Sequence, residues 1–202
     1  MPNRVRIFMD YWNFILDMKD YSASYRLDFE KLPSVLTHNS TITPGEARYD
    51  ETRVYASINR AKESERGLLR FLEDTVQTIP GYTVHVTKRK SKKGVHCPQC
   101  DSMIEYCPNC NSDLIKTVEK GVDTWIVTDM LQMAWDDVYD IGILLSSDRD
   151  YIPAVEFLHK REKKVIHASF SGVTCELAKK CWMHIDLRRF ASELKRTDSP
   201  SS

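Results

Sequence analysis

The amino-acid sequence predicts an α/β fold in which a mostly parallel central sheet carries helices on both faces. Two observations support this prediction. Short apolar runs with a strand-like pattern recur along the chain, and segments with helical periodicity separate them. Such alternation is typical of βαβ units, whose crossover helices cover both faces of a parallel sheet. The 202 residues are enough for one such domain with a small insertion.

Each element is predicted from its own pattern. The first strand, 5–9, is an apolar run, whereas 52–59 alternates apolar and polar residues. A helix is predicted over 62–77 because its leucines and a valine recur on one helical face. The same criteria predict further strands over 82–87, 141–145, 164–170 and 184–190, and further helices over 11–18, 27–36, 123–138, 152–162 and 174–181.

The domain boundaries follow from where this alternation stops. Residues 88–120 interrupt the alternation, and within them 94–113 contain four cysteines. We therefore expect residues 1–190 to form one domain that carries 94–113 as an insertion. The polar segment that ends the chain predicts a disordered tail over 191–202.

Composition excludes several classes of protein. Lys+Arg and Asp+Glu both total 29, so the formal net charge is zero and any signal for nucleic acid has to be local. Only seven glycines are present, and neither a P-loop nor a GxGxxG pattern occurs. The N-terminal sequence lacks a signal-peptide pattern, and no run reaches membrane-spanning length. We expect a cytoplasmic protein with no membrane partner, and a homodimer is left open.

Aspartates follow two of the predicted strands. Asp10 ends the first strand, and Asp148 and Asp150 follow the strand over 141–145. In open α/β sheets, ligands bind beyond the carboxyl ends of the strands, so these acids are expected at one edge. The alternative is that each aspartate only caps the helix that follows it.

A further acid comes from the helix that begins near Gly121. At about 100° per residue, Asp123 lies in the middle of the apolar face, in the first turn. Asp129 falls about 240° away, on the polar side with Asp136, which predicts a solvated side chain. Asp123 is therefore expected at the same end of the sheet as Asp10.

Three segments resemble the NYN-domain family of the PIN-like nuclease superfamily: "FMDYWN", "KGVDTWIVTDMLQMA" and "ILLSSDRDYIPAVEFL". The resemblance implies a metal-dependent nuclease, usually one that acts on RNA, and the choice between RNA and DNA stays open. It places Asn13 as a polar site residue, and Asp129 also matches a family position. The metal-binding acids that it implies are Asp10, Asp123, Asp148 and Asp150. Some relatives are thought to bind RNA with little catalysis, so a non-catalytic nucleic-acid adaptor is the alternative.

The chemistry of these residue types agrees with the resemblance. Clustered carboxylates suit Mg²⁺ or Mn²⁺, and two such ions can activate a water and stabilise the leaving oxygen of a phosphodiester. We assign Asp10 and Asp148 as central ligands, and Asp123 and Asp150 to the second ion or its waters. Asn13 would orient water or phosphate. A phosphatase that needs a second acid two residues after its first is excluded, since that position is Trp12.

Four cysteines in the interruption form a C-x2-C-x6-C-x2-C pattern, which predicts a four-thiolate structural zinc ribbon. The cysteines are Cys97, Cys100, Cys107 and Cys110. His96 could substitute for one of them, and four free thiols are the alternative. Cys175 and Cys181 lie near apolar residues and are expected in the core.

A basic segment, "KRKSKK", immediately precedes the cysteines and predicts a phosphate-binding arm. Its charged residues are Lys88, Arg89, Lys90, Lys92 and Lys93. A solvated loop without function is the alternative. Four aromatic residues could stack on bases or pack in the core: Tyr11, Trp12, Tyr106 and Trp125.

Overall fold

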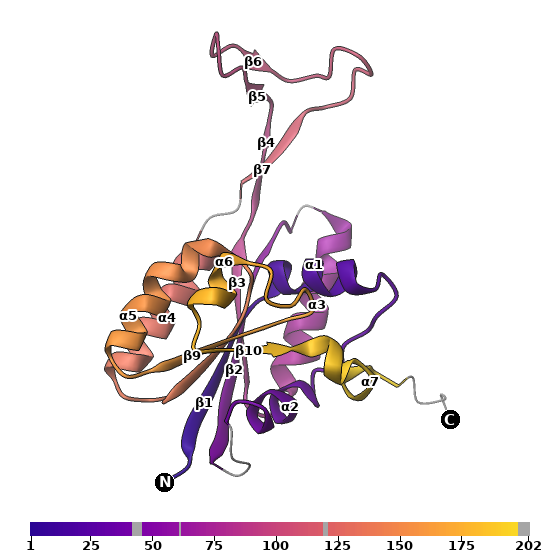
Figure 1. Ribbon diagram of the computed structural model, residues 1–202. Helices are drawn as coiled ribbons and strands as arrows, with labels where there is room; N and C mark the ends of the chain where they lie inside the picture. Colours follow the sequence, from indigo (N-terminus) through magenta and orange to yellow (C-terminus); the bar gives the residue numbers. More distant parts are fainter. Residues whose placement is uncertain (42–45, 61, 119–120, 198–202) are drawn as a thin grey trace.

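A six-stranded sheet forms the centre of the molecule (Figure 1). The computed structural model describes residues 1–41, 46–60, 62–118 and 121–197. The strands run in the order β10-β9-β8-β1-β2-β3, and every neighbouring pair is parallel. Their bounds are β1 Asn3–Asp10, β2 Ala47–Ile58, β3 Tyr82–Lys88, β8 Ile141–Leu145, β9 Lys164–Ser169 and β10 Met183–Asp186. The predicted parallel α/β fold is confirmed.

Helices cover both faces of this sheet (Figure 1). One layer consists of α1 Tyr11–Tyr21, α2 Leu32–His38 and α3 Glu63–Asp74, with the 3₁₀ turn η1 Val76–Thr78. The other consists of α4 Val122–Trp135, the 3₁₀ turn η2 Arg149–Tyr151, α5 Ile152–Lys160 and α6 Glu176–Lys180. Two buried apolar clusters lie between the sheet and its helices, one on each face. β1 contributes to both, because Ile7 and Met9 pack into one cluster and Phe8 into the other. Successive strand residues point to opposite faces, so a strand covered on both sides reads as an unbroken apolar run.

One predicted helix and one predicted strand differ clearly from the structure. The helix predicted over 27–36 begins only at Leu32, because Leu27 instead forms a bridge with Lys195. The strand predicted over 184–190 ends at Asp186, whose carboxylate caps the 3₁₀ turn η3 Leu187–Phe190.

The tail predicted to be disordered over 191–202 is wrong in its first part. Ala191–Leu194 form helix α7, and the side chain of Leu194 is fully buried. The backbone then pairs with residues near α2, since Arg196 N donates to the carbonyl of Arg26. Residues 198–202 lie outside the described residues.

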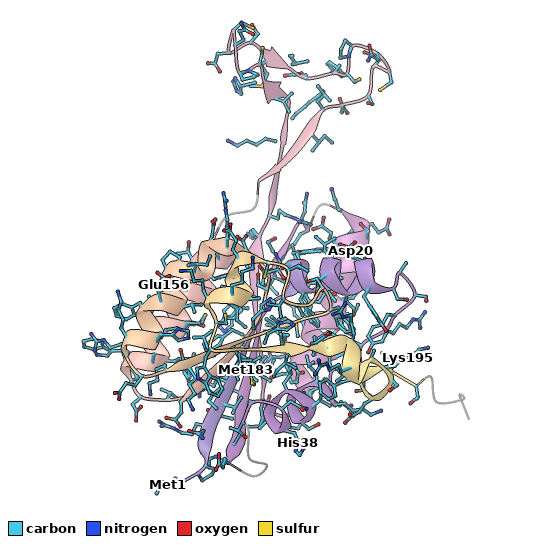
Figure 2. All side chains as sticks on the ribbon, in the orientation of Figure 1. Met1, Asp20, His38, Glu156, Met183 and Lys195 are labelled. Carbon is cyan, nitrogen blue, oxygen red and sulfur yellow. The ribbon has the colours of Figure 1, made fainter. Side chains whose placement is uncertain are left out.

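The interruption between β3 and α4 is a projecting arm (Figure 1). β4 Lys90–Lys93 pairs with β7 Ile115–Val118 in an antiparallel ribbon, and the tip carries β5 Val95–His96 paired with β6 Met103–Ile104. Side chains fill the space between the sheet and its helices (Figure 2). The side chains of the arm extend outward from its antiparallel ribbon (Figure 2). Within the described residues, no helix has the length and apolar character needed to cross a membrane.

The order of the strands creates a switch point at β1. The chain builds β2 and β3 on one side of β1, and β8, β9 and β10 on the other. The connections that leave β1 and β8 therefore diverge to opposite faces of the sheet. Ligand sites of open α/β sheets lie where such connections diverge, at the carboxyl ends of the strands.

Candidate functional site

Asp10 lies at this switch point. It is the last residue of β1 and the N-cap of α1, where its Oδ1 accepts a hydrogen bond from Asn13 N at 3.3 Å. The residue is 7% exposed, and its Oδ2 accepts hydrogen bonds from Ser146 Oγ at 3.4 Å and from Tyr151 Oη at 3.3 Å. Asp10 is thus a helix cap and also a buried carboxylate fixed by groups from the far side of the switch point.

Tyr151 links Asp10 to Asp123. Its ring is fully buried, and its hydroxyl also donates to Asp123 Oδ1 at 3.0 Å. Burial first, and then the two carboxylates, raise the pKa of this phenol far above its ordinary value. The phenol therefore stays protonated and remains a donor at neutral pH. Because one hydroxyl serves both acids, the first turn of α4 lies beside the end of β1.

Gly121 makes this placement of α4 feasible. It is the N-cap of the helix and has a φ of 95°, a left-handed conformation that residues with a Cβ rarely adopt. The chain turns sharply here as it leaves the arm. Asp123 follows in the first turn, where a negative charge is also favoured by the helix dipole.

The loop after β8 carries the remaining predicted acids. Asp148 is half-buried and caps η2, since its Oδ1 accepts a hydrogen bond from Asp150 N at 3.0 Å. Asp150 is exposed. Asn13 reaches the same loop from α1, and its Oδ1 accepts a hydrogen bond from Ser147 N at 2.8 Å. Asn13 therefore fixes the loop that carries Asp148 against α1.

The carboxylate oxygens are suitable ligands for a hard divalent cation, but they do not converge on one metal position. Among the described residues, no three His, Cys, Asp or Glu side chains converge closely enough to enclose a metal ion. Asp123, Asp148 and Asp150 form no ion pair with any described cationic side chain. Carboxylates that lie close together repel one another, and a bound cation relieves that repulsion. Oxygen ligands of this kind are those that Mg²⁺ and Mn²⁺ prefer.

Asp129 has a different environment from the one predicted. It is 7% exposed rather than solvated, and its Oδ2 accepts hydrogen bonds from Arg53 at 2.8 Å and from the hydroxyl of Tyr55 at 2.7 Å. Both partners belong to β2. Asp129 thus lies within an ion-pair network on the sheet, with partners from β2.

The predicted orientation of α4 is wrong for a physical reason. The buried residues of the helix centre about 80° away from Asp123, toward the flank of Asp129. The apolar face is wide because the helix packs on the sheet and also against α5. The middle of the apolar face of α4 therefore does not point straight toward the sheet. Asp123 nevertheless reaches Asp10, because it lies in the first turn and Tyr151 joins them.

The cysteines form two similar turns at the tip of the arm. We call residues 97–102 the first knuckle and 107–112 the second. In each, the N–H of the first cysteine donates to a serine carbonyl, and the residue after the second cysteine has a φ of 55°. Its N–H donates back to the first cysteine's carbonyl. The second cysteine of each knuckle lies near the first and near the serine hydroxyl, and these contacts lower the pKa of Cys100 and Cys110.

The two knuckles do not share a site in the described structure. The extended residues 103–106 join them, so the knuckles lie at opposite ends of a segment about 13 Å long. Tetrahedral zinc with bonds of about 2.3 Å needs all four sulfur atoms within about 4 Å of one another. Each knuckle therefore supplies a pair of thiols, and the four-thiolate site requires the tip to fold together.

The predicted basic arm is a β-ribbon rather than a loop. Lys88, the last residue of β3, and Lys92 of the ribbon are exposed. Arg89 is engaged instead, because it pairs with Glu65 at 2.8 Å and lies over the ring of Trp12. Lys93 pairs with Asp113 and lies over Tyr106, and the side chain of Lys90 falls outside the described part. Two of the five cations are thus held by structural partners.

Sequence reasoning missed a histidine pair behind the loop. His167 of β9 is fully buried, and its Nδ1 forms a 2.8 Å hydrogen bond with His184 Nδ1. Its Nε2 lies 3.4 Å from Ser147 Oγ. Burial, together with His184, lowers the pKa of His167 to about 4, so the imidazole is neutral. The only sequence signal was a histidine within the apolar run of β9.

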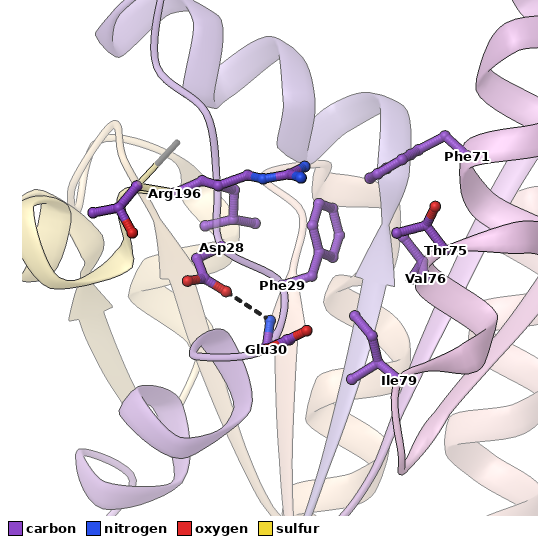
Figure 3. A pocket seen from close by; sticks show the side chains of 10 residues that line it. Asp28, Phe29, Glu30, Phe71, Thr75, Val76, Ile79 and Arg196 are labelled. Carbon is purple, nitrogen blue, oxygen red and sulfur yellow. Dashed lines mark hydrogen bonds between the residues drawn. The ribbon is translucent and has the colours of Figure 1, made fainter. Parts of the chain in front are cut away.

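Two hollows lie at the opposite, amino edge of the sheet. One, of about 440 Å³, is lined by Asp28, Phe29, Phe71 and Arg196 among others (Figure 3). The other, of about 560 Å³, lies near Trp135 at the end of α4. Neither contains a predicted site residue.

The chain was compared with protein families, with solved structures and with curated proteins. The sequence profile of the NYN domain matches residues 4–188. Among solved structures, the chain is similar to a protein of unknown function from Vibrio parahaemolyticus RIMD 2210633, with 18% identity and a TM-score of 0.56. The alignment covers 91% of this chain and 92% of that one, which shows a shared fold. No curated protein matches.

Proposed function

We propose that this chain, which belongs to the NYN domain family, is a metal-dependent ribonuclease that hydrolyses phosphodiester bonds. The family is one of PIN-like nucleases, which supports a nuclease activity on nucleic acid. The observation that carries the proposal is the link from Asp10 through the Tyr151 hydroxyl to Asp123, with Asp148 on the loop after the neighbouring strand. Acids far apart in sequence are gathered where the fold places ligands.

The proposed cofactor is Mg²⁺ or Mn²⁺. Asp10, Asp123, Asp148 and Asp150 would hold the metal ions, which supply an activated water and neutralise charge on the phosphate. The protein's own residues orient these acids. The phenol of Tyr151 keeps two carboxylates facing the same place, and Asn13 fixes the loop of Asp148 by its bond to Ser147 N. Such outer contacts set how well carboxylates bind a metal.

The proposed substrate is single-stranded RNA, and the arm supports it. The arm leaves the sheet at the end of β3 and leads into α4, so it projects from the carboxyl edge of the sheet, where the candidate site also lies (Figure 1). The exposed cations Lys88 and Lys92 attract a phosphate backbone. We propose that the nuclease domain includes α7 and acts in the cytoplasm, where cysteine thiols stay reduced.

We also propose one structural Zn²⁺ for the four cysteines. Support comes from the two knuckles, which have the same backbone turn and each bring two thiols together. Metal analysis of the purified protein should find one zinc per chain, and it should be lost when Cys97 and Cys100 are both replaced by serine. Protein that contains no zinc and reacts at all four thiols would contradict this assignment.

The alternative function is a nucleic-acid adaptor without catalysis. It is favoured by the projecting arm and by acids that do not converge on one point. The deciding experiment incubates the protein with labelled single-stranded RNA or DNA, in Mn²⁺ or in EDTA, beside Asp10→Asn and Asp148→Asn. A ribonuclease cuts RNA only with Mn²⁺, and neither variant cuts. Binding without cleavage in any divalent metal identifies the adaptor.

A further inference from the structure

Three aromatic rings form a stack that runs from the core to the surface beside the candidate site. Tyr55 of β2 stacks on His85 of β3, with ring centroids 5.1 Å apart and planes 13° apart. His85 in turn stacks on Trp125 of α4 at 6.2 Å and 19°. Tyr55 is buried, whereas Trp125 is 50% exposed. The stack therefore ends in an indole that solvent can reach.

The inner part of the stack is fixed. The hydroxyl of Tyr55 donates to Asp129, which also pairs with Arg53. Burial lowers the pKa of His85, so its imidazole is neutral at neutral pH and stacks as an uncharged ring. The two inner rings therefore hold the inner face of the Trp125 indole in place. Packing against the core does not account for the exposure of its outer face.

The position of Trp125 relates it to the acids. It follows Asp123 by two residues in the first turn of α4, which places the two Cα atoms about 5 Å apart on opposite flanks of the helix. Asp123 faces Tyr151, toward β1 and β8. Trp125 faces His85, toward the edge strand β3. A chain that lies across the carboxyl edge of the sheet would pass from one to the other.

Strand β3 offers polar groups along the same path. His85 and Thr87 alternate along the strand and so share one side of it. Each has a buried polar atom without a hydrogen-bond partner among the described residues: His85 Nε2 and Thr87 Oγ1. Along the strand, these groups lie between the ring of Trp125 and the start of the basic arm.

We propose that the exposed surface of Trp125 stacks on a nucleobase of a single-stranded substrate, one or two nucleotides from the phosphate at the acids. The inference rests on the proposed nuclease function and assigns its substrate contact. An exposed ring backed by a fixed stack suits any base, because every base has a π-face. A base inside a duplex is already stacked on both sides, so the site selects unpaired nucleotides.

A matched pair of tryptophans provides the test. Trp125 begins α4 and Trp135 ends it, and Trp135 is 74% exposed at the opposite edge of the sheet. Binding of a fluorescein-labelled 12-nucleotide RNA is measured by anisotropy in EDTA, so that no turnover occurs. Trp125→Ala should weaken binding by about 5- to 100-fold. Trp125→Phe should retain most of the affinity, Trp135→Ala should bind as wild type does, and a duplex of the same sequence should show no loss in Trp125→Ala.

Abasic substitutions locate the contact. With single abasic sites placed along the oligonucleotide, wild type should lose affinity at one position, and Trp125→Ala should not lose further affinity there. Melting curves verify that the variants are folded, and Trp125→Phe carries the test if Trp125→Ala does not fold. Equal RNA affinity of wild type and a folded Trp125→Ala overturns the stacking site. So does a Trp125→Phe variant that binds RNA as weakly as Trp125→Ala does. Cleavage assays in Mn²⁺ are separate: RNA binding through Trp125 without cleavage contradicts the nuclease, whereas cleavage unaffected by Trp125→Ala contradicts only the stacking site.

Discussion

Tyr151→Phe tests the link between the two halves of the candidate site. The substitution removes a single hydroxyl and keeps the buried ring in place. That hydroxyl lies 3.0 Å from Asp123 Oδ1 and 3.3 Å from Asp10 Oδ2. Hydrogen bonds to charged groups contribute about 1.5–3 kcal/mol each, and here one proton is shared by two carboxylates. We expect a loss of about 1.5–3 kcal/mol in EDTA, or a melting temperature lower by about 3–12 °C for a chain of this size.

The same substitution should change the metal dependence. Without the phenol, the carboxylates of Asp10 and Asp123 lose the donor that they share, and nothing holds Asp123 toward Asp10 in its place. Loss of an outer contact to metal ligands typically costs 10- to 100-fold in metal affinity or activity. The Mn²⁺ concentration that gives half-maximal cleavage should therefore rise by about 10- to 100-fold in Tyr151→Phe.

Tyr139→Phe is the matched control. Tyr139 is equally buried, and its hydroxyl donates to the carbonyl of Met130 at 2.9 Å, which is a neutral acceptor away from the acids. Its loss should cost about 0.5–1.5 kcal/mol and leave the Mn²⁺ dependence unchanged. Equal destabilisation by the two substitutions, with the same half-maximal Mn²⁺ concentration as wild type, would refute the role assigned to Tyr151.

Other measurements address separate parts of the molecule. Asp129→Asn should lower the free energy of unfolding by about 1.5–3 kcal/mol because Arg53 loses a charged partner, while Mn²⁺ dependence stays normal; a stable but inactive variant would instead make Asp129 a site residue. For His167, the folded pKa of about 4 lies below the unfolded value of about 6.5, so the unfolded chain binds more protons and stability falls as pH drops from about 6.5 toward 4. Urea unfolding should show about 2 kcal/mol less stability at pH 5 than at pH 7.5 from this group, and His167→Leu should remove that part of the pH dependence. Zinc chelation should weaken RNA binding more than it changes the cleavage rate, and an equal loss of both would place the knuckles in the catalytic centre.

The sheet could be predicted from the sequence because a parallel strand leaves a strong pattern. β1 and β8 are buried on both faces, so each reads as an apolar run, and each ends on or shortly before an aspartate. Topology alone then brings Asp10 and the loop of Asp148 to one edge. The predicted ends of elements were wrong where tertiary contacts determine them. Leu27 is an example, because it forms a β-bridge with Lys195 instead of starting a helix.

The details of the site could not be predicted in the same way. The periodicity of α4 shows which residues are apolar, but two packing partners share that face, so Asp129 turned out buried. The role of Tyr151 depends on where three separate elements meet, and no local pattern encodes it. The row of unpartnered groups on β3 likewise becomes visible only when α4 is placed beside that strand.

The switch point at β1 divides the site between two stretches of chain. Residues 1–88 supply Asp10, and residues 121–197 supply Asp123, Asp148 and Tyr151, with the projecting arm between them. A cut made at the tip of the arm would leave two polypeptides, each carrying an incomplete centre. Co-expressed, they would regain cleavage only when β1 of one fragment docks beside β8 of the other. Fused to two interacting proteins, the fragments would report that interaction by destroying an RNA.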